Sequence, residues 1–362
     1  MRRKIVYLIL AFINYILYFC KIQNNKITFI SYKSEKLEKD FKLISKNLES
    51  DNKYKIVYIL TKYQNTFIGN IKYLFNCIKQ VYHVNTSRVV ILDYNNFVVS
   101  HFKKKGVKVV QIWHASGAIK KFGNDIKREY PINNYDYVIS ASNFWKEIYS
   151  NAFNVNSNNV LPLGIPRTDS LFSKNKLLKY KESILEKYPQ IKGKKVILYA
   201  PTFRGDPRRG IKYQPINLKY IKDKLGDEYV LIYKLHPWLE DINITDSENI
   251  INGNKDGIRK LFSVTDYLIC DYSAVIFDFS ILEKPMIFYT PDLDEYKRER
   301  GMYEEYEKVM PGPICKTEKE IVDIIKNDKF PIDKIRGFKN KHFDYQDGKS
   351  TQRVSDFIKS LI

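Results

Sequence analysis

Nine short apolar runs, separated by longer amphipathic stretches, constrain the fold of this chain more than any other feature. Their nearly continuous apolar character, rich in β-branched and aromatic residues, is typical of parallel strands buried on both faces. The first series lies at 26–32, 54–60, 88–94, 107–113 and 135–140, and the second at 195–200, 229–235, 267–271 and 285–289. The pattern predicts an α/β protein with two doubly wound parallel sheets.

The segment between the two series marks a domain boundary. Residues 151–175 are rich in Asn, Ser, Pro and Gly, and a charged helical stretch follows at 176–187. We therefore expect a Rossmann-like domain over residues 25–170 and a second one over 171–362, facing each other across a cleft. The final stretch, 352–362, is amphipathic and is expected to pack as a closing helix.

Residues 1–24 form a separate segment with membrane-binding character. An apolar run at 5–20 is flanked by basic residues at positions 2–4, 21 and 26, and the large residues at 18–20 offer no signal-peptidase site. Its 16 residues would span about 24 Å as a helix, less than the roughly 30 Å of a hydrocarbon core. We expect a helix lying in the cytoplasmic membrane interface, with its basic flanks on anionic lipids. A buried first helix is the alternative.

The charge balance and the cysteines narrow the classes of partner. The chain carries 61 Lys and Arg against 41 Asp and Glu, and its net charge of +20 indicates an anionic partner. Anionic lipid and phosphorylated substrates fit best, and no nucleic acid is expected because the known aromatic and basic recognition motifs are absent. The four cysteines form no CxxC pair, so neither a metal site nor a disulfide framework is predicted, and a cytoplasmic location fits.

In open parallel sheets, ligands bind beyond the carboxyl ends of the strands, and four segments place polar residues there. The first is QIWHASGAIKKFG (111–123), in which His114 follows a buried strand and precedes small residues. Histidine can take up a proton near neutral pH, so His114 is a candidate general base. The alternative is a structural histidine under a loop. Catalysis is favoured because the chain has only five histidines and this one ends a buried strand.

The next two segments, APTFRGD (200–206) and KLHPW (234–238), supply candidate cations. Arg204 follows a strand and could clamp a phosphate, with a solvated loop arginine as an equal alternative. Lys234 and His236 alternate to the same side of an extended chain and would suit a pyrophosphate. An ordinary strand end is again the equal alternative.

The fourth segment, CDYSAVIFDFSILEKP (270–285), carries a strand–Ser–helix pattern. The strand is expected to end at Asp271, Ser273 to be the helix N-cap, and the helix to continue through Leu282. A helix N-terminus presents free N–H groups to an anion, so the segment is a candidate phosphate site. Asp278, five residues farther on, is placed to reach a ribose or substrate hydroxyl. The pattern alone is common and weakly specific.

Together these segments resemble the CDP-glycerol glycerophosphotransferase family, which builds teichoic acids and related capsule polymers in bacteria. The resemblance covers about residues 107–330 and rests on WHASGAIKKFG, LGIPRTD (163–169), YAPTFRGD, KLHP, TDYLICDYSAVIFDF (265–279), KPMIFYTPDLDEYKRERG (284–301) and PGP (311–313). It implies a two-domain GT-B-type fold that needs no metal and no cofactor for catalysis.

The resemblance also implies roles for individual residues. His114 matches the family's first histidine, with Ala-Ser after it in place of the commoner Gly-Thr, and His236 matches the second. The phosphate-binding Asp-Tyr-Ser-Ser of the family appears here as Asp271, Tyr272, Ser273 and, with one departure, Ala274. The donor's pyrophosphate is expected over the helix at Ser273, near Arg204, Lys234 and His236, with His114 as the base.

The implied reaction is the transfer of glycerol phosphate from CDP-glycerol to an undecaprenyl-diphosphate disaccharide in wall teichoic acid synthesis. We expect a primase that adds one unit at the cytoplasmic face of the cell membrane, because the region before residue 107 is short. The alternatives are a CDP-ribitol or CDP-glycerol polymerase for teichoic acid or capsule, and a GT-B glycosyltransferase that uses a nucleotide sugar.

Overall fold

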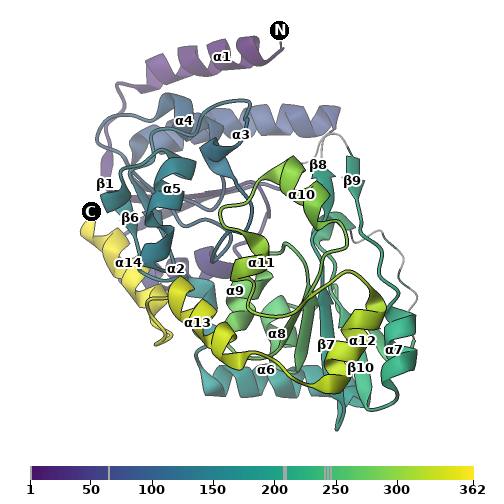
Figure 1. Ribbon diagram of the computed structural model, residues 1–362. Helices are drawn as coiled ribbons and strands as arrows, with labels where there is room; N and C mark the ends of the chain where they lie inside the picture. The colour runs from purple at the N-terminus through teal and green to yellow at the C-terminus, as the bar shows by residue number, and fades with distance from the viewer. Residues whose placement is uncertain (1, 64–65, 207–209, 240–241, 243, 245–246) are drawn as a thin grey trace. The chain divides into compact units, whose positions relative to one another are not determined.

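The chain forms two compact units, each built on one six-stranded sheet (Figure 1). The structure is a computed structural model and describes residues 2–63, 66–206, 210–239, 242, 244 and 247–362. Unit 1 comprises Met1–Ser116, Phe122–Asp169 and Phe343–Ile362, and unit 2 comprises Gly117–Lys121 and Ser170–His342. The predicted α/β class with two parallel sheets is confirmed.

The sheet of unit 1 is parallel throughout, with the strand order β2-β1-β3-β4-β5-β6. Its strands are β1 (Gln23–Ser31), β2 (Lys55–Leu60), β3 (Ser87–Leu92), β4 (Lys108–Gln111), β5 (Tyr137–Ile139) and β6 (Val160–Leu161). The central strands are buried along nearly their whole length, as parallel strands covered on both faces must be. The order reverses between β1 and β3, the kind of position where open sheets bind ligands.

Helices and short 3₁₀ turns surround this sheet. The helices are α1 (Arg2–Leu17), α2 (Lys39–Glu49), α3 (Phe67–Thr86), α4 (Phe97–Phe102), α5 (Lys146–Phe153) and α14 (Ser350–Ser360). The 3₁₀ turns are η1 (Gly123–Asp125), η2 (Asn143–Trp145), η3 (Ser157–Asn159) and η4 (Pro166–Ser170), the last of which ends at the unit boundary. Helix α1 packs on α3, and α2 packs on α14.

Unit 2 contains a second parallel sheet, with the order β11-β10-β7-β12-β13-β14. Its strands are β7 (Lys195–Ala200), β10 (Tyr229–Tyr233), β11 (Ile250–Asn252), β12 (Tyr267–Cys270), β13 (Met286–Tyr289) and β14 (Ile314–Cys315). A separate antiparallel pair is formed by β8 (Arg204–Asp206) and β9 (Gly210–Lys212). The order reverses between β7 and β12, so the residues that follow these two strands lie at the ligand-binding end of the sheet.

The helices of unit 2 pack in pairs, α6 with α8, α7 with α12 and α9 with α13. They are α6 (Lys174–Lys187), α7 (Leu218–Leu225), α8 (Ile258–Phe262), α9 (Val275–Ser280), α10 (Leu293–Arg300), α11 (Tyr306–Val309), α12 (Glu318–Asn327) and α13 (Ile332–His342), with 3₁₀ turns η5 (Pro189–Ile191) and η6 (Pro237–Leu239). Helix α12 begins with a capping box in which Thr317 and Glu320 each bond the other's backbone N–H.

All nine predicted strands are present, each within a few residues of its expected range. The strand expected at 107–113 ends at Gln111, because Trp113 has a positive φ of 52° that an extended strand cannot accommodate. Strands β6, β11 and β14 were not predicted, since two or three residues are too few to show a period. The expected helices at 176–187 and 352–362 are confirmed as α6 and α14.

The units divide the chain differently from the predicted domains at two places. The predicted boundary near residue 170 falls at the junction Asp169–Ser170, but Phe343–Ile362 belongs to unit 1. The reason is local, because the Asp169 carboxylate accepts hydrogen bonds from the N–H groups of Ser350 and Thr351 at 2.9 and 2.8 Å. This carboxylate satisfies free N–H groups at the start of α14. In the other direction, Gly117–Lys121, just after His114, belongs to unit 2.

The N-terminal segment forms α1, whose two sides differ. Leu10 is fully buried, and Asn14 accepts a hydrogen bond from Asn85 of α3 at 2.6 Å. The other side carries exposed apolar residues at helical spacing, namely Ile5, Leu8, Phe12, Tyr15, Ile16 and, beyond the helix, Phe19. Among the described residues, no helix is both long and apolar enough to cross a membrane. The side chains of Arg2 and Arg3 lie outside what the structure describes.

Candidate functional site

His114 of unit 1 follows β4, the neighbour of β3, and the strand order reverses between β3 and β1. Ser31, the last residue of β1, donates a hydrogen bond at 3.0 Å to the carboxylate of Asp93, which follows β3. The Nδ1 atom of His114 lies 3.4 Å from the Asp93 main-chain oxygen. Because a carbonyl oxygen can only accept, this contact places the imidazole proton on Nδ1 and leaves the lone pair on Nε2.

Two aromatic rings fix the plane of the His114 side chain. The Tyr94 ring stacks on the imidazole, with centroids 4.3 Å apart and planes 8° apart. The Trp113 ring contacts the imidazole at a centroid distance of 3.8 Å. The side chain is partly buried, so it is held in one orientation and keeps some access to solvent.

The environment of His114 keeps its imidazole neutral. Burial lowers the pKa of His114 well below its usual 6.5, and the cations of Arg167 and Lys33 lower it further. The contact with the Asp93 carbonyl opposes this shift in the pKa. A neutral imidazole with its lone pair on Nε2 can accept a proton at physiological pH, which is the chemistry predicted for this residue.

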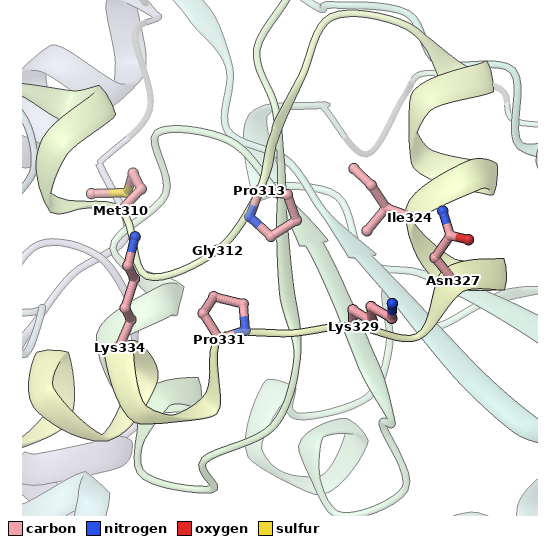
Figure 2. Close-up of a pocket in the computed structure, with 8 residues that line it drawn as sticks. All are labelled: Met310, Gly312, Pro313, Ile324, Asn327, Lys329, Pro331 and Lys334. Carbon is pink, nitrogen blue, oxygen red and sulfur yellow. The ribbon is translucent and has the colours of Figure 1, made fainter.

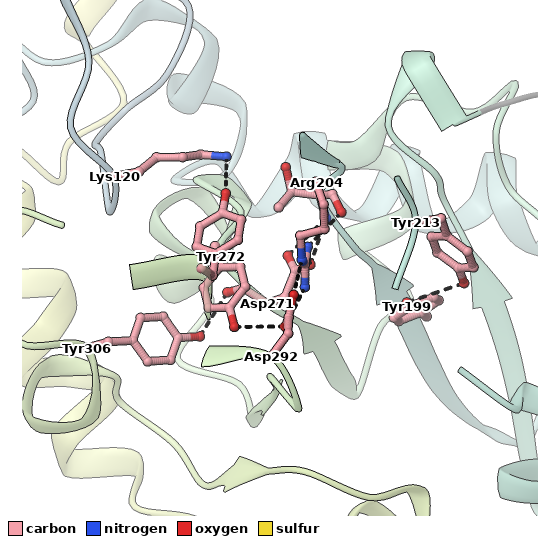
Figure 3. Close-up of polar contacts among 10 residues, drawn as sticks. Lys120, Tyr199, Arg204, Tyr213, Asp271, Tyr272, Asp292 and Tyr306 are labelled. Carbon is pink, nitrogen blue, oxygen red and sulfur yellow. Dashed lines mark hydrogen bonds and ion pairs between the residues drawn. The ribbon is translucent and has the colours of Figure 1, made fainter. Parts of the chain in front are cut away.

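In unit 2, Arg204 lies at the start of β8, where its guanidinium is 7% exposed and held by two carboxylates (Figure 3). Its Nη1 donates to Asp271 at 2.7 Å, and its Nε donates to Asp292 at 2.6 Å. The N–H of Thr202 also donates to Asp271, at 2.9 Å. Arg204 was predicted to clamp a phosphate, whereas in this structure its donors are directed at protein acceptors.

Tyrosines enclose this ion-pair network. The rings of Tyr272 and Tyr296 stack with centroids 3.8 Å apart, and the Arg204 guanidinium lies over both. The Tyr272 hydroxyl donates to Asp292 at 3.0 Å, and the Tyr306 hydroxyl donates to the Asp271 carbonyl at 3.0 Å. Burial alone would raise the pKa of Asp292, but the hydrogen bonds and charge of Arg204 lower it below its usual value. Buried carboxylates, the arginine and stacked rings together make a rigid polar core.

Lys120 is a site residue that the sequence analysis missed. It comes from the segment after His114 that joins unit 2, where it pairs with Met302 in an isolated bridge. Its Nζ (Figure 3) donates to the Tyr296 hydroxyl at 2.8 Å. The same atom lies 5.5 Å from the centre of the Phe203 ring. Burial lowers the pKa of Lys120 to about 8, an effect opposed by Asp271 and reinforced by Arg300 and Arg204. The sequence feature that could have pointed to Lys120 is a pair of lysines that directly follows an apolar residue inside a motif with two glycines.

The predicted pair Lys234 and His236 follows β10 in unit 2. The Lys234 ammonium donates to the main-chain oxygen of Asn254 at 2.9 Å. The His236 ring contacts Phe203 at a centroid distance of 4.9 Å, and its Nδ1 accepts from the Trp238 N–H at 3.2 Å. Phe203 therefore contacts both His236 and Lys120, so these two basic residues gather around one aromatic ring.

The strand–Ser–helix segment is present but shorter than predicted. Helix α9 has six residues and begins after Ala274, which is the N-cap in place of Ser273. The Ser273 hydroxyl instead accepts from the Val275 N–H at 3.4 Å. Asp278 is nearly buried in α9 and lies 4.0 Å from Arg259. A six-residue helix has a weak terminal dipole. The cations of unit 2 therefore support an anion site more strongly than the start of α9 does.

The described residues hold no metal-binding group, and a cavity in unit 2 lies apart from this end of the sheet. None of the described His, Cys, Asp and Glu side chains form a group of three or more that could hold a metal ion. A cavity of about 550 Å³ lies in unit 2, on the side where β14 begins, and Figure 2 shows the residues around it. It is lined by Met310, Gly312, Pro313, Ile324, Asn327, Lys329, Pro331 and Lys334. Because β14 begins there, the cavity lies at the amino ends of the parallel strands, opposite their carboxyl ends. It is therefore separate from the Arg204 network.

Comparisons with known proteins match nearly the whole chain. The sequence profile described as CDP-Glycerol:Poly(glycerophosphate) glycerophosphotransferase matches residues 10–360. The teichoic acid ribitol-phosphate primase of Bacillus spizizenii (strain ATCC 23059 / NRRL B-14472 / W23) is 34% identical, over 94% of this chain and 92% of that protein. The teichoic acid glycerol-phosphate primase of Bacillus subtilis (strain 168) is 36% identical, over 79% of this chain and 77% of that protein.

Solved structures share the fold. The wall teichoic acid polymerase TagF superposes with a TM-score of 0.76 at 24% identity, over 99% of this chain and 95% of that one. A variant of TagF soaked with CDPG matches with a TM-score of 0.75 at 25% identity, over 96% and 92% of the two chains. The predicted GT-B-type fold is thereby confirmed.

Proposed function

The chain belongs to the CDP-glycerol:poly(glycerophosphate) glycerophosphotransferase family, and we propose that it transfers glycerol phosphate from CDP-glycerol to an undecaprenyl-diphosphate disaccharide in wall teichoic acid synthesis. Family membership makes it a transferase; the donor, the acceptor and the number of units added are the proposal. The observation that carries the proposal is His114, a neutral histidine with its Nε2 lone pair available for a proton.

In the proposed reaction, His114 acts as the general base. The acceptor hydroxyl oxygen forms a bond to the phosphorus that carries glycerol, and its proton passes to Nε2 of His114. The bond from that phosphorus to the bridging diphosphate oxygen breaks, and CMP leaves. A general base of this kind contributes about 10² to 10⁴-fold, and positioning of the two substrates supplies much of the remainder.

Unit 2 is the proposed donor-binding unit. A diphosphate needs cations near the carboxyl ends of the strands, and the basic residues around Phe203 supply them through Lys120 and His236. We assign Arg204 and Asp271 to holding the shape of this site, because their charges are already paired. Lys234, Ser273, Ala274 and Asp278 complete the proposed donor site. Their places after β10 and β12 support that assignment.

A membrane surface is the proposed setting, because the acceptor's lipid tail stays in the bilayer. Unit 1 exposes the apolar side of α1, and the adjoining α3 exposes Phe67, Ile68, Ile71 and Phe75. Exposed lysines at positions 4, 21 and 72 add positive charge on the same two segments. Apolar area with flanking lysines suits the cytoplasmic leaflet, which carries anionic lipids, and the net charge of +20 agrees with this choice.

The primases among the relatives support the proposed primase activity, and their names leave two donors to compare. Two primases align along most of this chain, and one of them uses ribitol phosphate by its name. CDP-ribitol is therefore the second candidate donor. A competition between CDP-glycerol and CDP-ribitol at equal concentration, followed by mass analysis of the product, would identify the preferred one.

The deciding experiment incubates the full chain with CDP-glycerol and a synthetic undecaprenyl-diphosphate disaccharide. We expect CMP release that requires the acceptor, and a product heavier by one glycerol phosphate unit. A ladder of products would replace the primase proposal by a polymerase. Turnover with UDP- or GDP-sugars, and none with either CDP-alcohol, would overturn the proposed donor. EDTA is included as a further arm, in which the rate is expected to stay unchanged.

A further inference from the structure

Arg167 is a buried arginine of unit 1 whose guanidinium faces the main chain of the His114 turn. It lies in η4, within the LGIPRTD motif, and is 8% exposed. Its Nη1 donates to the carbonyl oxygen of His114 at 2.6 Å, and its Nη2 donates to that of Trp113 at 3.2 Å. One planar guanidinium thus binds two successive carbonyl groups, which its rigid fork can hold at a fixed angle.

Asp40 holds Arg167 in turn. It lies in the first turn of α2, is 2% exposed, and accepts from Nη2 of Arg167. Its second oxygen accepts from the backbone N–H of Arg167 at 2.7 Å. Buried ion pairs contribute little net stability, because desolvation offsets their attraction. A role in fixing the position of neighbouring groups explains this pair better than a role in stability alone.

The turn that Arg167 binds is one that its own residues disfavour. Trp113 has a φ of 52°, in the left-handed region that bulky side chains rarely adopt. This conformation ends the strand and turns the chain so that His114 meets Tyr94 and the Asp93 carbonyl. Contacts from outside the turn must stabilise it, and Arg167 supplies two of them.

We propose that Arg167, fixed by Asp40, is a positioning residue for His114 that holds the histidine turn. The inference rests on the proposed role of His114 as the base. It assigns a role to Arg167 of the LGIPRTD motif, which the donor site does not explain. Arg167 acts through His114 and takes no proton itself.

The charges around His114 determine the sign of the expected effects. Arg167 from η4 and Lys33 and Lys39, on either side of the start of α2, are cationic, while Asp93 after β3 and Asp40 in α2 are the nearby acids. Removing the cation of Arg167 should raise the pKa of His114, and removing the charge of Asp40 should lower it further. Burial holds the pKa of Asp93 up at about 7, so the measurements belong below that pH.

The first test observes His114 directly by NMR in the full chain with labelled histidine, assigned by loss of its signal in His114→Asn. In the wild type we expect an Nδ1–H tautomer with a pKa below 6.5. Arg167→Met should move that pKa upward and Asp40→Asn downward. This test needs no substrate, so it stands even if the proposed reaction is wrong. An unmoved pKa and tautomer in both variants would overturn the inference.

The second test measures kinetics with CDP-glycerol. Arg167→Met should leave the donor KM within about 2-fold and lower kcat about 10- to 100-fold, since small misplacement of a catalytic group has costs of this order. The acidic limb of the kcat profile should shift to higher pH. Arg167→Lys should keep that limb in place yet recover only part of kcat, because an ammonium cannot bind both carbonyl groups at the same angle.

Lys33→Met is the matched control, because it removes a cation near His114 without touching the turn. We expect it to move the acidic limb upward while the kcat plateau changes by less than about 3-fold. If Arg167→Met fails to fold, Arg167→Lys and Asp40→Asn carry the test through the NMR tautomer and pKa. A different result would be a fraction of folded Arg167→Lys that falls by the same factor as kcat, while the His114 tautomer stays unchanged. That result would show that Arg167 has only a structural role.

Discussion

Each unit places one buried arginine near the carboxyl ends of its strands, and the two arginines do different work. In unit 1, Arg167 shares its donors between Asp40 and the carbonyl groups of the histidine turn. In unit 2, Arg204 is held by Asp271 and Asp292 among stacked tyrosines. One arginine binds the turn that carries the proposed base, while the other is paired within a polar network of unit 2.

The difference shows that a cation at a strand end is not necessarily a phosphate ligand. A guanidinium with two carboxylates has little attraction left for a phosphate, because its charge is already balanced. Lys120 differs in that its described hydrogen bond goes to a neutral tyrosine hydroxyl. We therefore expect unit 1 to govern the proton transfer, and unit 2 to govern donor binding chiefly through its lysines. The predictions below test that division.

The largest effect is expected from His114→Ala, which removes the proposed base from unit 1. Turnover should fall about 10² to 10⁴-fold, while the Kd for CDP-glycerol, measured by calorimetry, should stay within about 2-fold. His101→Ala is the control, since that histidine of α4 bonds its own helix through the Phe97 carbonyl. A His114 variant that lost donor binding together with turnover would break the division between the units.

The next effect is on stability, through Arg204→Met in unit 2. Removing one partner of a buried ion pair leaves uncompensated carboxylates, and should lower the free energy of unfolding by about 3–5 kcal/mol. Urea unfolding would measure this loss, with the exposed Arg298→Met of α10 as a control expected within about 0.5 kcal/mol. Unchanged stability with a large loss of donor affinity would instead make Arg204 the phosphate ligand that its sequence position predicted.

A smaller effect is expected from Lys120→Met, which should weaken CDP-glycerol binding about 10-fold, the cost of roughly one charge-assisted hydrogen bond. The wild-type affinity should also fall as pH rises through about 8, because the ammonium is charged only below its pKa. In Lys120→Met this limb should disappear. The neighbouring Lys121→Met is the matched control, since Lys121 is exposed. Equal behaviour of the two variants would remove Lys120 from the donor site.

The sequence was sufficient for nine strands of the two sheets and for the position of His114 after β4, because both follow from local apolar pattern and strand ends. It could not reveal that Arg204 is paired with Asp292, since the two lie 88 positions apart and meet only through packing. The partner of Arg167, Asp40, lies 127 positions away for the same reason. The predicted length of the helix after Ser273 was too great, because the apolar spacing in the sequence continues past the residue at which the helix ends.

The smallest effect is expected at the apolar side of α1, which is proposed to place unit 1 against the membrane that holds the acceptor. Leu8 is 64% exposed, and partial burial of such a side chain in a lipid interface is worth about 0.7 kcal/mol, roughly 3-fold in partitioning. Leu8→Ala should therefore reduce co-sedimentation with anionic vesicles about 3-fold. It should slow the reaction with the long-chain acceptor by a similar factor and leave a short-chain, soluble acceptor unaffected. Leu178→Ala is the control, because Leu178 of α6 is 57% exposed but belongs to unit 2. An equal loss on both acceptors would mean that α1 supports the fold of unit 1, and a matching loss in Leu178→Ala would mean that membrane contact is not confined to that unit.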